Sequence, residues 1–328
     1  MSPQPTHLRV HQFAGLEPGP RLLVSAAVHG NEVHGEKAIR RVMAALDAGE
    51  IVLQRGTVTF IPIVNPLAHQ LGRREGDRNL NRNLRPPVVA QDFEDRIARQ
   101  LCPLLASHDV LLDLHSFQSP GVPFAMMGPR NNTGSLEPFA HAEAEGRLAL
   151  AVGTERIVEG WLSTYELGLK RRAEREELAG VSGRANSLQQ DPNYGVGTTE
   201  YFRSQGGYGI TLECGQHEDP NGPEVAYLAI LRTLVVLDMA QASIVSARPA
   251  QPPELLQLYE VVDRYSEGDQ FERAWTSFDP VTKGQRIGTR ADGTPVLAVD
   301  DGRIIFPASN AKPGSEWFYL ARASQRQL

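Results

Sequence analysis

Short apolar runs without polar alternation recur along the first two thirds of the chain, and a helical pattern or a polar loop follows each of them. Runs of this kind are typical of strands that other elements cover on both faces, as in a parallel sheet. We predict such strands at residues 22–28, 57–64, 110–114 and 208–214. Pro62 lies inside the second run and predicts that this strand ends early or adjoins a bulge.

Apolar residues at roughly helical spacing occupy the segments between these strands. They predict helices at residues 33–48, 90–107 and 223–245, and the charged stretch 170–178 predicts a further helix. Because strands and helices alternate, we predict an α/β fold with a mixed, mostly parallel sheet and helices on both faces.

A change in composition divides the chain into two predicted domains. Pro and Ala dominate residues 247–254, which predicts a linker after a first domain of residues 1–246. Residues 255–328 then form short alternating segments broken by Asp-Gly, Lys-Gly and Pro-Gly turns. This pattern predicts a small C-terminal β domain.

Composition and charge narrow the class of protein. The chain has 328 residues, 41% of them apolar, and a net charge of −6, which speaks against a nucleic-acid or anionic-membrane partner. Cys102 and Cys214 form no C-x-x-C motif, so neither a disulfide framework nor a thiolate zinc site is indicated. The N-terminus lacks an apolar signal region, and Arg232 and Asp238 interrupt the apolar stretch 225–244, so we expect a cytoplasmic protein.

The stretch "VHGNEVHGE" holds two histidines and two glutamates directly after a predicted strand, where α/β folds place ligand sites. His29 and Glu32 are three residues apart, so a helix or a turn could bring both to one metal ion. Glu36 is a rival ligand, because on a continuous helix it would share a face with Glu32. His34 follows His29 by five residues and does not form the His-Glu-x-x-His zinc motif.

A third ligand is expected, because catalytic zinc commonly has three protein ligands and a water. His115 follows the predicted strand 110–114. Parallel strands bring their carboxyl ends to one edge of a sheet, so His29 and His115 could meet there. Asp113 could support one of these ligands through a hydrogen bond. Taken alone, His115 could instead be a buried histidine with no metal.

The polar segment 65–89 is rich in Arg and Asn and shows no periodicity. A loop of this length inside a compact domain is uncommon unless it is functional. Arginine suits bidentate carboxylate binding, so Arg82 with Asn81 could bind a substrate carboxylate. A solvated surface loop is the alternative explanation of this charge run.

Glu213 ends the apolar stretch "GITLECGQH" and is unexpected there for packing alone. Near a metal-bound water it would be a general base that later passes the proton to a leaving amine. It could instead be a structural carboxylate paired with Arg203, and Arg203 could otherwise contact the substrate.

Four motifs occur in order: "HGNE", "NPLAHQLGRREGDRNLNRNL", "LDLHS" and "GITLECG". Together they resemble the succinylglutamate desuccinylase and aspartoacylase family, a branch of the zinc carboxypeptidase superfamily. The resemblance covers nearly the whole chain, because "FDPVTKGQRIG" and "DDGRIIFP" resemble that family's C-terminal β domain. It implies a zinc-carboxypeptidase-like fold in which residues 1–246 are a zinc hydrolase domain.

The resemblance also implies roles for individual residues. One Zn²⁺ per chain would have three ligands: His29, Glu32 and His115. Glu213 would be the base that activates water, and Arg74 would stabilise the oxyanion that develops at the scissile carbonyl. Asn81 and Arg82 match the pair that binds the amino acid's carboxylate. Arg203 matches a position that contacts a second carboxylate.

One position departs from the family: Asn79 stands where relatives usually have Asp, which removes a negative charge beside the carboxylate-binding pair. We expect a zinc-dependent hydrolase that cleaves the amide of a small anionic N-acylated amino acid. Succinylglutamate, in arginine breakdown, is the first candidate substrate, followed by N-acetylated amino acids. The alternatives are a zinc carboxypeptidase acting on short peptides and a non-catalytic binding protein on the same scaffold. The oligomeric state, including a homo-oligomer, stays open.

Overall fold

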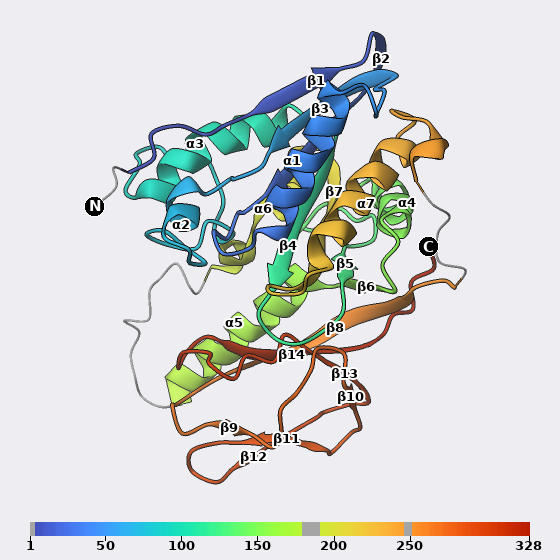
Figure 1. The fold of residues 1–328 in the computed structure, drawn as a ribbon. Coiled ribbons are helices and arrows are strands. Elements are labelled where there is room, and N and C mark those ends of the chain that lie inside the picture. Colours follow the sequence, from blue (N-terminus) through green and yellow to red (C-terminus); the bar gives the residue numbers. More distant parts are fainter. Residues whose placement is uncertain (1–3, 179–190, 246–250) are drawn as a thin grey trace.

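The computed structural model describes residues 4–178, 191–245 and 251–328. In these ranges an eleven-stranded sheet runs through the molecule (Figure 1). Its strands are, in spatial order, β1 (His11–Ala14), β3 (Arg55–Ile61), β2 (Glu17–Ala26), β4 (Val110–Phe117), β7 (Tyr208–Gln216), β5 (Phe124–Met126), β6 (Arg156–Glu159), β8 (Glu254–Asp263), β14 (Glu316–Ala323), β13 (Gly302–Ile305) and β10 (Pro280–Val281). A second sheet has three described strands: β12 (Pro295–Leu297), β11 (Arg286–Thr289) and β9 (Gln270–Phe271).

The centre of the large sheet is parallel. The parallel pairs are β3 with β2, β2 with β4, β4 with β7, β5 with β6 and β6 with β8. The antiparallel pairs are β1 with β3, β5 with β7, β8 with β14, β14 with β13 and β13 with β10. The predicted α/β fold with a mixed, mostly parallel sheet is therefore confirmed.

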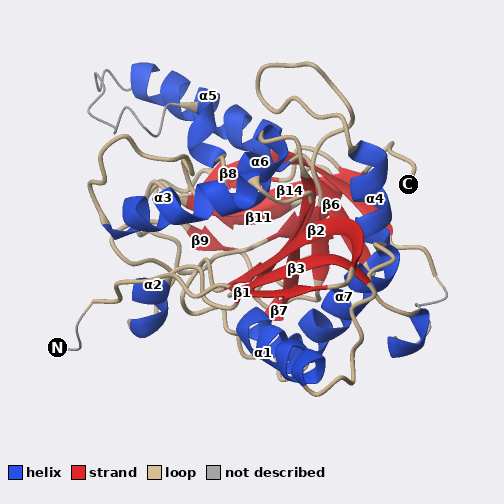
Figure 2. Cartoon of the chain, turned by 90° about the horizontal axis from the view of Figure 1, so that it is seen from above, coloured by secondary structure: helices blue, strands red, loops and turns tan. Residues whose placement is uncertain are grey.

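Helices cover both faces of the parallel centre (Figure 2). One face carries α1 (His34–Asp47), α4 (Ala142–Ala151) and α7 (Gly222–Val236), and the other carries α3 (Phe93–Ala106) and α6 (Thr198–Ser204). Successive side chains of a strand point to opposite faces of the sheet. Leu22 and Val24 therefore pack in the core under α1, α4 and α7, and Leu23 packs in the core under α3 and α6. Four further helices are α2 (Pro66–Gln70), α5 (Trp161–Leu178) and the 3₁₀ turns η2 (Pro192–Gly195) and η3 (Ala242–Ile244). None of the helices in the described ranges has the length and apolar character needed to cross a bilayer.

Element boundaries differ from the predicted ones at several places, and three of the differences have a clear physical cause. β3 ends at Ile61, directly before Pro62, as that proline predicts. The helix predicted to reach residue 245 is shorter, because α7 ends at Val236 and Asp238 has a left-handed φ of 54°. The predicted loop 65–89 contains α2, which is capped by the side chain of Asn65 but is too short to show a helical period.

The strands after residue 254 continue the large sheet. Residues 247–250 of the predicted linker 247–254 lie outside the described ranges. β8 begins at Glu254, the last residue of that predicted linker, and pairs in parallel with β6. These C-terminal strands also enclose a core of their own, which includes Trp275, Ile287 and Trp317. Figure 1 shows β9 to β13 gathered at the end of the molecule opposite β1. Sheet continuity brings β14 close to the polar residues described next.

Candidate active site

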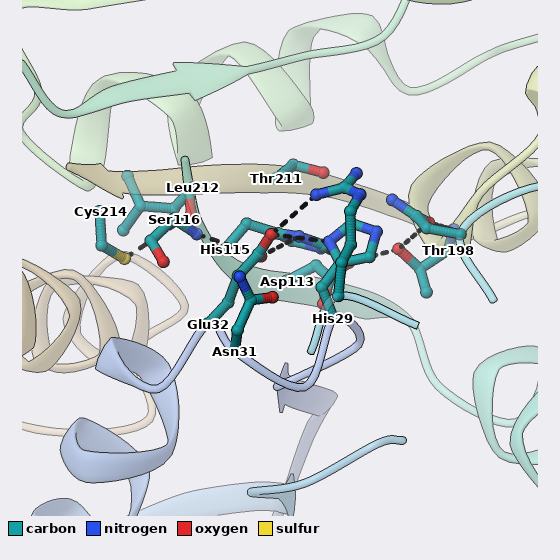
Figure 3. Close-up of polar contacts among 12 residues, drawn as sticks. His29, Asn31, Glu32, Asp113, His115, Ser116, Thr198, Thr211, Leu212 and Cys214 are labelled. Atoms are coloured by element: carbon teal, nitrogen blue, oxygen red, sulfur yellow. Dashed lines mark hydrogen bonds and ion pairs between the residues drawn. The ribbon is translucent and has the colours of Figure 1, made fainter. Parts of the chain in front are cut away.

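Two buried histidines and one buried glutamate meet at the carboxyl ends of β2 and β4. His29 Nδ1 is 2.8 Å from Glu32 Oε1, and His115 Nδ1 is 2.9 Å from Glu32 Oε2. One donor atom from each residue lies within 4.8 Å of the other two (Figure 3). β2 and β4 are parallel neighbours, so their carboxyl ends lie at the same edge of the sheet. The predicted convergence of these three residues is therefore present.

The segment that carries His29 and Glu32 is a turn ahead of α1. The backbone N–H of Glu32 donates to the carbonyl oxygen of His29 at 3.1 Å. Gly30 lies against a neighbouring backbone segment, and a Cβ at Gly30 would be 2.0 Å from the carbonyl carbon of Ala68. No side chain fits in that space, which explains why a glycine lies between His29 and Glu32.

His34 and Glu36 are directed elsewhere. His34 Nε2 donates a hydrogen bond to the carbonyl oxygen of Gln216 at 2.9 Å. Glu36 on α1 pairs with His69 at 2.8 Å and with Arg40 at 2.9 Å. Of the alternatives that the spacing left open, His29 with Glu32 is the pair that converges with His115.

Each histidine of the cluster has a second partner on the ring nitrogen that faces away from Glu32. His115 Nε2 lies 2.9 Å from Asp113 Oδ2, and His29 Nε2 lies 3.1 Å from Asn79 Oδ1. The Asp113 carboxylate also accepts hydrogen bonds from two hydroxyl groups, those of Ser25 and Thr198. The hydrogen bond expected between Asp113 and a candidate ligand is present, and Asn79 contacts the other candidate ligand in the same way.

The charges of this cluster are suited to a bound cation. Burial and the Arg74 guanidinium lower the pKa of His29 to about 4, so its ring is neutral near pH 7. Burial opposes a charge on His115, but the Asp113 and Glu32 carboxylates outweigh it and raise that pKa. Burial likewise opposes a charge on Glu32, but the two histidines outweigh it and lower its pKa. Two imidazole nitrogens and a carboxylate oxygen are ligands that zinc accepts. These three residues can hold a metal ion.

Glu213 lies next to this cluster on β7. It is the register partner of His115 on β4 and is only 9% exposed. Its Oε2 is buried and has no hydrogen-bond partner among the described residues. Burial and the negative charge of Glu32 raise the pKa of Glu213 to about 8. An unpartnered buried carboxylate beside three metal donors is costly for stability alone and indicates a chemical role.

Arg74 lies at the solvent side of the cluster. Its guanidinium donates to Glu32 Oε1 at 3.1 Å, and 49% of its side chain remains exposed. A half-exposed cation beside the candidate metal donors can meet negative charge on a bound ligand.

Asn81 and Arg82 follow in the same loop and contact each other and the start of α6. Asn81 Oδ1 accepts the backbone N–H of Thr198 at 2.8 Å. Arg82 donates to the carbonyl oxygen of Asn81 at 2.9 Å, and its guanidinium lies 5.1 Å from the Trp161 ring centre and 5.6 Å from that of Tyr165. The loop predicted to be functional therefore contributes Arg74, Asn79 and Asn81 to one region.

Three residues of this region carried no sequence signal that we recognised: Trp161, Glu316 and His217. Although burial opposes it, the Glu316 carboxylate on β14 raises the pKa of Arg82, so the C-terminal strands reach the loop. His217 Nδ1 lies 2.9 Å from Ser116 Oγ, directly after the ligand His115. His217 follows β7 at the sheet edge that carries the ligands, and that position could have suggested it.

The structure does not bring Arg203 to this region. Its guanidinium contacts Glu137 at 2.7 Å, Glu200 at 2.9 Å and Glu145 at 3.4 Å, and only 3% of the side chain is exposed. It also donates to the carbonyl oxygen of Gly209, near the start of β7 and four residues before Glu213. Arg203 pairs with three other carboxylates, so neither the expected pairing with Glu213 nor a free guanidinium for a substrate is observed.

Comparison with known proteins supports the resemblance. Residues 18–126 match the family described as succinylglutamate desuccinylase/aspartoacylase catalytic domain. The curated N-alpha-acetyl-L-2,4-diaminobutyric acid deacetylase of Halomonas elongata is 33% identical over 104 residues, which are 30% of this chain and 29% of that protein. The match thus spans less than a third of the relative's length.

Solved structures share the fold over nearly the full chain. A succinylglutamate desuccinylase/aspartoacylase from Rhodobacter sphaeroides has a TM-score of 0.71 and 18% identity and covers 97% of this chain and 90% of its own. The product-bound ectoine utilization protein EutE (DoeB) from Ruegeria pomeroyi has a TM-score of 0.67 and 20% identity, with 96% and 88% covered. Residues 18–126 therefore match the succinylglutamate desuccinylase/aspartoacylase catalytic-domain family, and the chain as a whole shares the fold of solved structures that carry this description.

Proposed function

We propose that this protein is a zinc-dependent hydrolase that cleaves the amide bond of an N-acylated amino acid. The observation that carries the proposal is the buried, unpartnered carboxylate oxygen of Glu213 beside the converging donors of His29, Glu32 and His115. Such a pair of features is what metal-assisted hydrolysis needs: a metal ion and a positioned base.

His29, Glu32 and His115 would hold the zinc ion. When bound, the ion supplies Lewis acidity, which makes water a better nucleophile and polarises the acyl carbonyl. Its positive charge would also lower the pKa of Glu213 from the value of about 8 in the metal-free site, so that the carboxylate is ionised at neutral pH.

Glu213 would take a proton from the attacking water and pass it to the departing amine. A carboxylate with a free oxygen in a buried site can accept that proton without first breaking another hydrogen bond. The products are a carboxylic acid and a free amino acid.

Three residues of the 65–89 loop would bind and orient the substrate. Arg74 would stabilise the negative charge that develops on the acyl oxygen, because its half-exposed guanidinium already lies against Glu32. Asn81 and Arg82 would bind the amino acid's carboxylate through the geometry of their donors. Their mutual contact and the contact of Asn81 with Thr198 keep this pair in a fixed place.

The named relatives support this class of reaction. The Halomonas elongata relative is described as the deacetylase of an N-acetylated amino acid, and the similar Rhodobacter sphaeroides structure is described as a succinylglutamate desuccinylase/aspartoacylase. Short peptides are the alternative substrate class, so the test includes them.

The test combines metal analysis with a substrate panel. Purified protein should contain about one zinc per chain and should release amine from N-acetyl- or N-succinyl-amino acids. Cleavage of short peptides alone would replace this proposal by a carboxypeptidase. Bound zinc without hydrolysis of either class would favour a binding protein.

A matched pair of variants separates the metal site from general damage. Glu32→Gln removes a ligand and should abolish both zinc content and turnover. Glu36 lies in the first turn of α1 and pairs with His69 and Arg40, so Glu36→Gln should retain both zinc content and turnover. Loss of zinc from both variants would argue against the assigned ligand set.

A further inference from the structure

The two histidines of the candidate metal site are supported by partners of different charge. His115 Nε2 meets the carboxylate of Asp113 at 2.9 Å, whereas His29 Nε2 meets the amide oxygen of Asn79 at 3.1 Å. Both rings direct Nδ1 at Glu32. The site is therefore symmetric in geometry and asymmetric in charge.

The chemical identity of the Asn79 atom is settled by a third group. The backbone N–H of Asn81 donates to the same Asn79 atom at 2.9 Å. A backbone N–H can only donate, so this atom is the amide oxygen and not the amide nitrogen. An oxygen acceptor next to His29 Nε2 requires that Nε2 carries the hydrogen.

A neutral imidazole carries one ring hydrogen, so Nδ1 of His29 then presents a lone pair toward Glu32. Nδ1 lies 2.8 Å from Glu32 Oε1, which is also an acceptor. Two acceptors at this distance repel each other unless a proton or a metal ion lies between them. The hydrogen bond on the far side of the ring thus decides which nitrogen is free for a metal.

We propose that Asn79 is a positioning residue that holds His29 in the Nε2–H tautomer and, being uncharged, leaves it a weaker metal ligand than an aspartate partner would. A carboxylate partner makes an imidazole a better donor because it stabilises positive charge on the ring, as Asp113 does for His115. An amide oxygen orients the ring without that charge. This inference rests on the metal site of the proposed function.

Asn79 also connects the metal site to the carboxylate-binding pair. Its oxygen holds the Asn81 backbone, and the Asn81 side chain holds the backbone N–H of Thr198. The Thr198 hydroxyl donates to Asp113, the partner of His115. Hydrogen bonds therefore link the outer partners of both histidines through the residue proposed to bind substrate.

The experiment compares Asn79→Asp, Asn79→Ala and Asn83→Asp. Asn83 lies in the same loop with a φ of 50°, a conformation that Asp also tolerates, so it controls for added negative charge. Zinc affinity is measured by competition with a chelator, and the ring ¹⁵N shifts of His29 are measured in the metal-free protein. We expect Asn79→Ala to weaken zinc binding roughly 10–100-fold and Asn79→Asp to tighten it roughly tenfold. Asn83→Asp should leave the affinity within about twofold of the wild type, because it touches neither ligand.

The outcomes separate this inference from the proposed function. His29 in the Nε2–H tautomer, with the expected order of zinc affinities, supports it. His29 in the Nδ1–H tautomer, or an Asn79→Asp affinity no higher than that of the wild type, overturns this inference alone. A wild-type protein that binds no zinc overturns it together with the metal site. Asn79→Asp is nearly isosteric, so the comparison holds even where Asn79→Ala fails to fold.

Discussion

Glu213 on β7 is the direct register partner of His115 on β4. In a parallel pair, register partners carry their side chains to the same face of the sheet, so the proposed base and a proposed metal ligand are neighbours by construction. Neither lies on a flexible loop. The distance between base and metal ligand is therefore controlled by two buried central strands.

Replacing Glu213 by Gln should separate catalysis from metal binding. The amide cannot take a proton from water, so we expect turnover to fall at least about a hundredfold. Zinc content should stay at the wild-type level, because Glu213 is not one of the three converging donors. The measurement is steady-state turnover together with zinc content, with the exposed Glu218→Gln as the control. Unchanged turnover in Glu213→Gln would show that the base is wrongly assigned.

Glu137 should make the stability of the protein depend on pH. Burial raises the pKa of Glu137 from about 4.5 to about 7, and Glu200 adds to this effect against the attraction of Arg203. A carboxyl group whose pKa is higher in the folded chain adds stability that is full below about pH 4.5 and is lost as the pH rises through about 7. Glu137→Gln should therefore be more stable than the wild type by about 1–2 kcal/mol at pH 8 and equal to it at pH 4.5.

Thermal unfolding at both pH values checks this expectation. The matched control is Glu143→Gln on α4, whose partner Arg147 is also exposed. A stabilisation of Glu137→Gln that is the same at both pH values would contradict a titrating Glu137.

Arg203 should matter for folding rather than for substrate binding. Arg203→Gln would leave three carboxylates without their cation, two of them buried (Glu145 and Glu200), so we expect a loss of about 3–5 kcal/mol in the free energy of unfolding. Arg147→Gln breaks an exposed pair and should cost less than about 1 kcal/mol. Denaturant unfolding measures both. An Arg203 variant of normal stability with a raised KM would instead restore the substrate-contact role that the sequence resemblance implies.

Arg82 should control substrate affinity through the substrate carboxylate. Lysine keeps the charge but loses the planar pair of donors, so Arg82→Lys should raise KM roughly tenfold with a smaller change in kcat. The nearby exposed Arg85→Lys is the control. A substrate whose carboxylate is converted to an amide should respond little to Arg82→Lys. Equal effects on both substrates would show that Arg82 does not bind the carboxylate.

The convergence of His29 and His115 was predictable because the signals for it are local. His29 and His115 each follow an apolar run that forms a central parallel strand, and parallel strands end at one edge. The spacing of the residues left both Glu32 and Glu36 as candidate partners of His29. Spacing alone does not show at which residue the following helix begins. Only packing against the backbone of Ala68 shows why the chain turns at Gly30.

The sequence by itself determined the fold class, the order of the central elements and the meeting of His29 with His115, since apolar period and strand-end position are properties of neighbouring residues. The choice of Glu32 over Glu36 needed the tertiary structure. The tertiary structure alone decided the partners of the arginines. Arg203 and its partner Glu137 are 66 residues apart, and Arg82 interacts with Glu316 on the distant strand β14. The partners of both arginines therefore depend on how distant elements pack. Charge pairing over such separations leaves no periodic trace in a sequence. For that reason the sequence does not distinguish the two arginines, although Arg203 pairs with three carboxylates and Arg82 lies beside Asn81, Trp161 and Tyr165.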